Sequence, residues 1–285
     1  MHQGQRLWML AGTGEGPVLA AQLLQRGWRL RVSLVSAAAA LAYRPLLKDW
    51  GGHRLELAIG PLDGAAAIAR ALQQARFQGD PVAVVVDATH PFALQISQAL
   101  VAACSAEAVP LLRLQRELSA PAEATVLPQL SDLAAEALQG VPLLLALGGR
   151  QLAAAVACSA GAVHHARVLP APGALQFALA AGLAPARIAC LRPSADFGVE
   201  AALVRQWGIR AIVCRQSGGL TQAGWQQVSQ RHGCRLLLVQ RPGPESGAKA
   251  SPVVALSEAA LSEAALLAKL DALMRDFAIA CAQPR

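Results

Sequence analysis

Aromatic residues and lysines are scarce in this chain. Phe, Trp and Tyr make up only 4% of its 285 residues, which argues against a surface on which single-stranded nucleic acid stacks its bases. The only lysines are Lys48, Lys249 and Lys269, so the net charge of +7 comes from arginines scattered singly along the chain. Such arginines suit discrete anionic ligands better than a duplex, and no nucleic-acid partner is expected.

Cysteine pairs and long apolar stretches are also missing. The six cysteines include no Cys-x-x-Cys pair and no His at ligand spacing, so neither a disulfide framework nor a zinc site is predicted. No apolar stretch reaches membrane-spanning length, and the first apolar run stops at Gly12, too early for a signal peptide. These features predict a cytoplasmic protein with reduced thiols and no membrane partner.

Three catalytic motifs are absent as well. The chain has no Gly-x-Ser-x-Gly nucleophile elbow, no metal-binding box and no Walker loop. Covalent and metal-assisted catalysis therefore have no support in the sequence, and no metal is expected.

Apolar residues are plentiful, at 54%, and they occur in short runs that alternate with helical patterns. This alternation predicts parallel sheets of the α/β class. The predicted strands are 7–11, 30–35, 55–59, 82–86, 109–114, 142–147, 163–169, 187–191, 210–214 and 235–240. The predicted helices include 17–26, 64–78, 92–104, 131–138, 196–207 and 220–231.

The length suits two small domains. Residues 1–115 are predicted to form one Rossmann-like domain and residues 116–242 a second, with an interdomain cleft and a link at 115–125. In the last part, 243–285, a loop rich in Pro, Gly and Ser comes first. A C-terminal helix from Ser257 to about Cys281 should then pack back on the domains.

The most informative stretch is 82–92. Val82 to Val86 predict a strand buried on both faces of a sheet, and the polar residues Asp87, Thr89 and His90 follow at once, before Pro91. Ligands of open α/β sheets bind beyond the carboxyl ends of the strands, so this cluster is a candidate site. Asp87 and His90 are candidate catalytic residues. The alternatives are that Asp87 braces the loop and that His90 positions a ligand.

A glycine turn joins the first predicted strand to a helix. Its residues are Gly12, Thr13, Gly14, Glu15 and Gly16. Such a turn lets a pyrophosphate approach the backbone and the helix dipole. It is a variant of the dinucleotide fingerprint, because Pro17 stands where the third glycine falls. The alternative is a tight turn without a ligand.

The end of the second predicted strand indicates which cofactor is held. An NAD site usually offers Asp or Glu to the ribose there, whereas this chain has Ser36 followed by alanines, with Arg44 nearby. Hydroxyls and a cation favour the 2′-phosphate of NADPH. An unliganded loop is the alternative.

Arginines recur at the ends of predicted strands, where they can bind carboxylates or phosphates bidentately. They are Arg113, Arg150, Arg192, Arg215 and Arg241. Ser217 and Gly218, with a further glycine behind them, form a second anion-friendly turn after Arg215. The predicted substrate is therefore anionic.

Several of these motifs resemble, in order along residues 6–242, the precorrin-6A reductase (cobalt-precorrin-6A reductase) family of cobalamin biosynthesis. The motifs are Gly-Thr-Gly-Glu at 12–15, Asp-Ala-Thr-His-Pro-Phe-Ala at 87–93, Leu-Arg-Leu-Gln-Arg at 112–116, Gly-Arg at 149–150, Ser-Gly-Gly at 217–219 and Arg-Pro at 241–242. The stretch 87–93 is the most specific of them.

The resemblance implies two Rossmann-like domains and a reductase that uses a reduced nicotinamide to convert precorrin-6A to precorrin-6B. It also implies a polycarboxylate tetrapyrrole as substrate, which the arginines would suit, and transient contact with neighbouring enzymes of the pathway. NADPH would lie against residues 12–16, Ser36, Arg44 and the 89–91 turn. His90, Asp196 and solvent are the candidate proton donors.

Four alternatives stay open on the sequence alone. The protein could act on the cobalt-bearing ring with NADH, or it could be another NADP-dependent reductase of an anionic substrate. It could also be a sugar-nucleotide transferase, which likewise places a ligand between Rossmann-like domains, or a non-catalytic nucleotide-sensing module.

Overall fold

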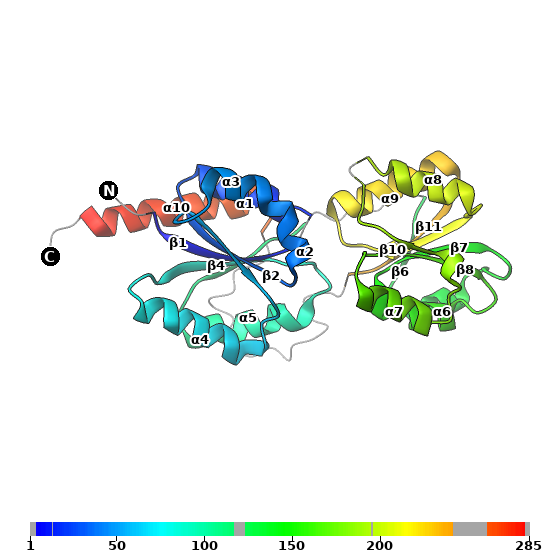
Figure 1. The fold of residues 1–285 in the computed structure, drawn as a ribbon, viewed down its shortest axis with the longest axis horizontal. Helices are drawn as coiled ribbons and strands as arrows, with labels where there is room; N and C mark the ends of the chain where they lie inside the picture. The colour runs from blue at the N-terminus through cyan, green and yellow to red at the C-terminus, as the bar shows by residue number, and fades with distance from the viewer. Residues whose placement is uncertain (1–3, 13, 117–122, 195, 242–260, 283–285) are drawn as a thin grey trace. The chain divides into compact units, whose positions relative to one another are not determined.

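A computed structural model describes residues 4–12, 14–116, 123–194, 196–241 and 261–282. The chain divides into two compact units, which we call the first unit (1–117 with 242–285) and the second unit (118–241). Each unit is a fully parallel sheet with helices on its faces, which confirms the predicted α/β class (Figure 1). The predicted interdomain cleft stays a prediction.

The first unit has five strands in the order β3-β2-β1-β4-β5. They are β1 (Arg6–Ala11), β2 (Arg29–Leu34), β3 (Leu55–Ile59), β4 (Val82–Ala88) and β5 (Leu111–Arg113). Alternate residues of β1 enter different cores: Leu7 and Met9 pack on one face of the sheet, Trp8 and Leu10 on the other. Burial on both faces explains why these strands are apolar throughout.

Helices cover both faces of this sheet (Figure 1). One face carries α1 (Gly16–Gln25), α3 (Arg44–Trp50) and α10 (Glu263–Ala282), and the other carries α4 (Gly64–Phe77) and α5 (Leu94–Ala106). Two short helices, α2 (Ala37–Ala40) and the 3₁₀ turn η1 (Leu41–Tyr43), precede α3. Among the described helices, none is long and apolar enough to cross a membrane.

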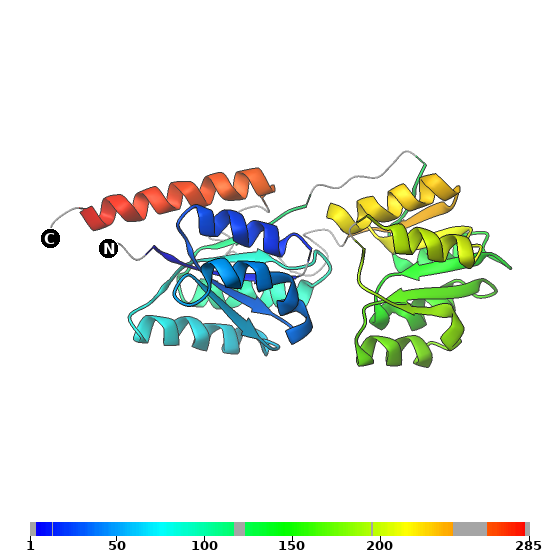
Figure 2. The same cartoon turned by 45° about the horizontal axis from the view of Figure 1, so that its top comes forward.

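The C-terminal helix α10 packs on the first unit, along α1 (Figure 2). Its Leu266 and Leu270 are fully buried, and each contributes about 2 kcal/mol by leaving water. The prediction that this helix starts at Ser257 is wrong, since it begins at Glu263 after Ser262, whose Oγ accepts a hydrogen bond from Ala265 N. Two Leu-Ser-Glu-Ala-Ala copies five residues apart carry the same capping signal, and Ser257 itself lies outside the described residues.

The second unit has six strands in the order β6-β11-β10-β7-β8-β9. They are β6 (Thr125–Leu127), β7 (Pro142–Ala146), β8 (Val163–Val168), β9 (Ile188–Cys190), β10 (Ala211–Arg215) and β11 (Arg235–Val239). One face carries α6 (Leu152–Cys158) and α7 (Pro172–Ala180), the other α8 (Gly198–Gln206) and α9 (Gly219–His232) (Figure 1). The 3₁₀ turns are η2 (Leu130–Ala135), η3 (Gly149–Gln151) and η4 (Pro185–Arg187).

Two local predictions are corrected by the structure. The helix expected over 131–138 is the 3₁₀ helix η2, which starts after Gln129 because Gln129 and Asp132 form a reciprocal capping box. The helix expected from Phe92 starts at Leu94, because β4 continues to Ala88 and a turn closed by Ala93 N and His90 O follows. Asp87 therefore belongs to the strand rather than to the loop.

The strand orders define one switch point in each sheet. Chain connections diverge from β1 and β4 in the first unit, and from β7 and β10 in the second. At such a point the loops beyond two neighbouring strands lead to opposite faces and leave a crevice for a ligand. Both crevices lie where the sequence carries its glycine turns.

Candidate functional site

The crevice of the first unit lies between the ends of β1 and β4. Leu10 pairs with Asp87 and Ala11 with Ala88, so the glycine turn at 12–16 and the turn at 89–92 start side by side. Two stretches about 75 residues apart in the sequence thus form one site.

Gly12 and Gly14 leave open space at this crevice. A Cβ built on either residue would meet no atom within 4 Å, and neither has a positive φ among the described glycines. Packing and backbone conformation therefore do not require glycine at these two positions. The open space fits the close approach of a pyrophosphate to the backbone. Thr13, also predicted to bind the cofactor, lies outside the described residues.

Gly16 has a different reason to be glycine. Its Cβ would lie 2.2 Å from Tyr43 Oη and 2.9 Å from Ala11 Cβ. The tyrosine hydroxyl donates a hydrogen bond to Gly12 O at 2.8 Å, and burial raises the pKa of Tyr43, which keeps the donor protonated. Through this hydrogen bond, Tyr43 stabilises the glycine turn. The sequence analysis missed this role, although Tyr43 is the only tyrosine in the chain.

Glu15 stands at the N-cap of α1, beside the turn. Its Oε2 pairs with Arg116 Nη2 at 2.9 Å, and both side chains are largely buried. The arginine offsets a carboxylate that would otherwise repel a phosphate at this helix end. Arg116 is a second residue that the sequence reasoning did not assign to the site.

Asp87 is the hub beneath the second turn. It is only 2% exposed, and it accepts hydrogen bonds from Thr89 N (3.0 Å), Thr89 Oγ1 (2.6 Å) and Ser97 Oγ (2.6 Å). Arg113 Nε lies 3.6 Å from its Oδ2. Both carboxylate oxygens are thus engaged by the protein, an arrangement that suits bracing of the turn.

His90 lies exposed on the same turn, beside the buried Pro91. Its Nδ1 accepts a hydrogen bond from Phe92 N at 3.3 Å, and its ring rests on Phe92 with the ring centroids 5.6 Å apart. A neutral imidazole that accepts at Nδ1 carries its proton on Nε2. The bond from Phe92 N thus fixes the orientation of the imidazole on the turn.

Ser36 and Arg44 belong to the same edge of the sheet. Ser36 follows β2, the neighbour of β1, and its Oγ accepts from Ala39 N at 3.3 Å to cap α2. Arg44 starts α3 and is exposed. The residues from Val35 to Ala40 include no carboxylate that could bind a ribose 2′-hydroxyl.

In the second unit, the loops beyond β7 and β10 meet. Arg215 Nε donates to Gln151 Oε1 at 3.0 Å, and burial lowers the pKa of Arg215. A Cβ on Gly148 would lie 3.8 Å from Arg215 Nη2, which places this guanidinium beside the start of η3, where Arg150 is exposed. Arg150 and Arg215 thus belong to one crevice of the second unit.

The Ser217–Gly218 turn is closed by the protein itself. Gly218 N donates to Oε1 of the buried Gln222 at 2.8 Å, and Ser217 Oγ donates to Gly218 O at 3.2 Å. Both residues are buried. Arg241 follows β11, beside β10, whereas Arg192 follows β9, two strands away from β7.

Asp196 lies exposed at the start of α8. Its Oδ1 accepts a hydrogen bond from Gly198 N at 3.0 Å, and this bond lowers the pKa of the carboxyl group. The group is therefore ionised at neutral pH, a form that cannot donate a proton. Across the described part of the chain, no group of three or more His, Cys, Asp or Glu residues could hold a metal ion.

A parallel sheet with an open glycine turn at its switch point is the arrangement of nucleotide-binding Rossmann-type proteins. Comparison with known proteins narrows this class. The family model described as "Precorrin-6x reductase CbiJ/CobK" matches residues 6–262, and the chain belongs to this family. It is therefore an NAD(P)-dependent oxidoreductase of cobalamin biosynthesis, and the family implies a tetrapyrrole substrate.

Relatives agree with this assignment. The chain is 31% identical over 244 residues to the cobalt-precorrin-6A reductase of Synechocystis sp., covering 83% of this chain and 88% of the relative. It is 30% identical over 243 residues to the precorrin-6A reductase of Rhodococcus erythropolis, with 83% and 89% covered. The solved structure of the CobK precorrin-6A reductase has the same fold, with a TM-score of 0.70, 24% identity and coverage of 94% and 97%. The transferase and sensing-module alternatives are thereby set aside.

Proposed function

We propose that the protein reduces one double bond of the precorrin-6A macrocycle with NADPH to give precorrin-6B. The observation that carries this proposal is the open space at Gly12 and Gly14, at the switch point of the first sheet. When bound there, the reduced nicotinamide supplies the hydride. The protein has only to hold the cofactor and the ring in register, because a conjugated macrocycle is itself an electron acceptor.

Residues of the first unit bind the cofactor in this proposal. The backbone from Gly12 to Gly16 receives the pyrophosphate, and Ser36 and Arg44 receive the 2′-phosphate. The absence of a carboxylate after β2 supports NADPH over NADH. His90, with Thr89 and Pro91, positions the cofactor, and Asp87 holds their turn through its bonds to Thr89.

Arginines bind the carboxylates of the substrate in this proposal. They are Arg113, Arg150, Arg192, Arg215 and Arg241, with Ser217 and Gly218 shaping the surface beside Arg215. A guanidinium matches a carboxylate bidentately, which suits a ring with several acidic side chains. Asp196 is kept as a carboxylate by Gly198 N, so His90 and solvent remain as sources of the proton.

One of the two relatives is named a cobalt-precorrin-6A reductase and the other a precorrin-6A reductase. The test therefore compares the cobalt-bearing ring with the metal-free ring. Anaerobic oxidation of NADPH and NADH is followed by absorbance with metal-free and with cobalt-bearing precorrin-6A. Faster turnover with NADPH and the metal-free ring supports the proposal. Turnover with NADH and the cobalt-bearing ring alone would replace it, and binding of NADPH without oxidation in either assay would contradict it.

A further inference from the structure

A cavity lies at the amino end of the first sheet, at the opposite end of β1 from the glycine turn. Its volume is about 540 Å³, within the range of sites for small molecules. The lining comes from β1, β2 and β3 together with α4, and includes Arg6, Arg29, Arg31, His53, Glu56 and Asp80. None of these residues takes part in the proposed reduction.

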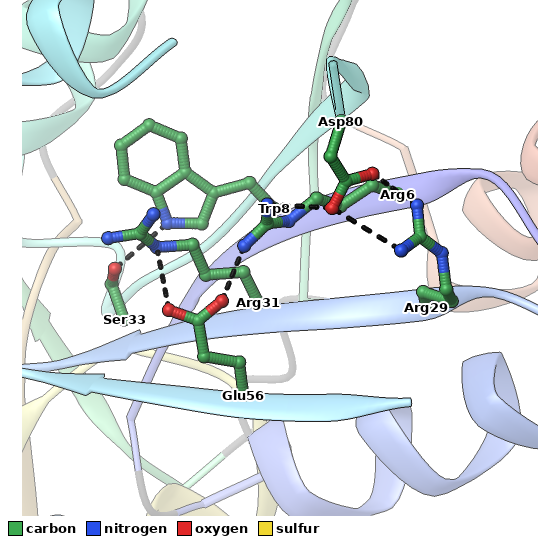
Figure 3. Close-up of polar contacts among 7 residues, drawn as sticks. All are labelled: Arg6, Trp8, Arg29, Arg31, Ser33, Glu56 and Asp80. Carbon is green, nitrogen blue, oxygen red and sulfur yellow. Dashed lines mark hydrogen bonds and ion pairs between the residues drawn. The ribbon is translucent and has the colours of Figure 1, made fainter. Parts of the chain in front are cut away.

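All three arginines lie within ion-pair distance of a carboxylate, but only Arg6 and Arg29 form hydrogen bonds with one (Figure 3). Asp80 lies between Arg6, at 2.9 Å, and Arg29. Glu56 pairs with Arg6, and Arg29 Nε also donates to Gly4 O at 2.6 Å. These contacts give Arg6 and Arg29 hydrogen-bonded carboxylate partners.

Arg31 carries the third positive charge of the cavity and shares Glu56 with Arg6. Its Nε forms an ion pair with Glu56 Oε1 at 3.8 Å, too far for a hydrogen bond, and this buried Nε has no hydrogen-bond acceptor among the described residues. The side chain is nevertheless held in place, with the guanidinium carbon 5.4 Å from the ring centre of Trp8. Trp8 is itself fixed by a 2.8 Å bond from its indole N–H to Ser33 Oγ (Figure 3). A buried N–H without an acceptor costs free energy, which an acceptor atom of a bound ligand would recover.

We propose that this cavity binds a small oxyanion, a phosphate or carboxylate group, through Arg31. Three guanidinium groups face two carboxylates, so the cavity keeps one net positive charge before His53 is counted. Gln74 of α4 and Gln78, the residue after α4, add neutral donors at the wall. The site is separate from the cofactor crevice, because the five steps of β1 from Arg6 to Ala11 span about 17 Å. An oxyanion bound there does not compete with the nicotinamide cofactor.

The indole N–H of Trp8 offers a local probe, since the ring touches Arg31. In a ¹H–¹⁵N spectrum of the full chain, assigned with Trp8→Phe, this signal should shift as inorganic phosphate replaces chloride at constant ionic strength. A second titration uses acetate, and the tighter of the two ligands identifies the group preferred. We expect saturation with a Kd of about 1 mM or tighter for at least one of them.

The variants decide whether Arg31 is responsible. Arg31→Gln should weaken binding about tenfold or more, whereas Arg70→Gln, an exposed arginine on α4, should leave it unchanged. Arg31→Lys keeps the charge and is the reserve variant if Arg31→Gln does not fold; it should bind more weakly than the parent. A Trp8 signal that stays still with both anions, or that shifts equally in the Arg31 variants, would overturn the proposal.

Discussion

Both units carry a glycine-containing turn at the switch point of a parallel sheet. The glycines of the two turns have different structural roles. In the first unit, Gly12 and Gly14 have ordinary φ and open space beside them. In the second unit, Gly218 has a φ of 68°, and its N–H is bound to Gln222 inside the protein. Glycine leaves open space for a ligand in one turn and serves the backbone conformation in the other. The same motif after the same kind of strand therefore does not imply the same function.

The largest effect is expected when the open space at Gly12 is filled by a side chain. Gly12→Val should lower the affinity for NADPH about 100-fold, because the side chain occupies the path of the pyrophosphate. The melting temperature should change little, since no atom lies within 4 Å of the new Cβ. Fluorescence titration with NADPH measures the affinity. Gly173→Val is the matched control, because Gly173 also has open space but lies in α7. Equal affinity in both variants would contradict a cofactor site at Gly12.

Asp87→Asn tests the hydrogen-bonded cluster around Asp87, next to the crevice of the first unit. The change removes the charge that faces Arg113 and turns one acceptor of a buried cluster into a donor. We expect a loss of about 2 kcal/mol in the free energy of unfolding, measured with urea, and a raised KM for NADPH. Glu200→Gln makes the same change in the second unit, where Glu200 accepts from Ser194 N and Oγ. It should lower stability but leave the KM for NADPH as it is.

Arg44→Ala tests the choice of cofactor in the first unit. Loss of a charge-assisted bond to the 2′-phosphate should weaken NADPH binding about tenfold. NADH lacks this phosphate, so its affinity should not change. Parallel titrations with the two cofactors measure the difference, and Lys48→Ala, a change to an exposed cation of the same helix, is the control. An equal loss for both cofactors would remove Arg44 from the phosphate site.

Gly218→Ala completes the comparison of the two turns. Gly218 has a φ of 68° and a ψ of −179°, a conformation that essentially only glycine adopts, so a side chain there costs on the order of 1–3 kcal/mol, which denaturant unfolding should report. The affinity for NADPH should stay at the parent value, because this turn belongs to the second unit. The outcome would be the reverse of that for Gly12→Val. A weakened affinity for NADPH would show that the two turns act on one ligand.

The stability of the second unit should also depend on pH through two of its histidines, His164 and His165. Burial lowers the pKa of His164 and of His165, and the positive charge of Arg187 adds to the effect. The unfolded chain then takes up protons below pH 6.5 that the folded second unit resists. Stability should therefore fall as the pH drops through that value and be fully present above it. Thermal melts across this range, with His165→Gln as the variant, should show a shallower slope for the variant. An equal slope would place the effect elsewhere.

Much of the architecture could be predicted from local patterns. The buried strands of both sheets show as apolar runs, and the alternation with helices predicts parallel pairing. The errors occurred where that signal is weak. β6 has only three residues, two of them exposed, and lies close to a stretch that looks like a linker. Asp87 is polar, so it looked like the end of β4, although three donors inside the protein stabilise it within the strand.

Part of the candidate site could also be located from the sequence. The glycine turn, the 87–92 stretch and the arginines after strands can be found by their position alone. Tyr43 and Arg116 could not, because their partners Gly12 and Glu15 are distant in sequence and become neighbours only in the folded first unit. The internal closure of the Ser217–Gly218 turn by Gln222 was equally invisible.

The amino-acid sequence by itself determined the class of fold and the family of this protein, because apolar periodicity and the Asp-Ala-Thr-His-Pro-Phe-Ala stretch are local properties. Only the tertiary structure decided the order of the strands and, with it, which turns face each other. It also distinguished the open glycine turn from the closed one and left the buried Nε of Arg31 without a hydrogen-bond acceptor. These features depend on packing between distant segments, and no local pattern encodes which donor finds which acceptor.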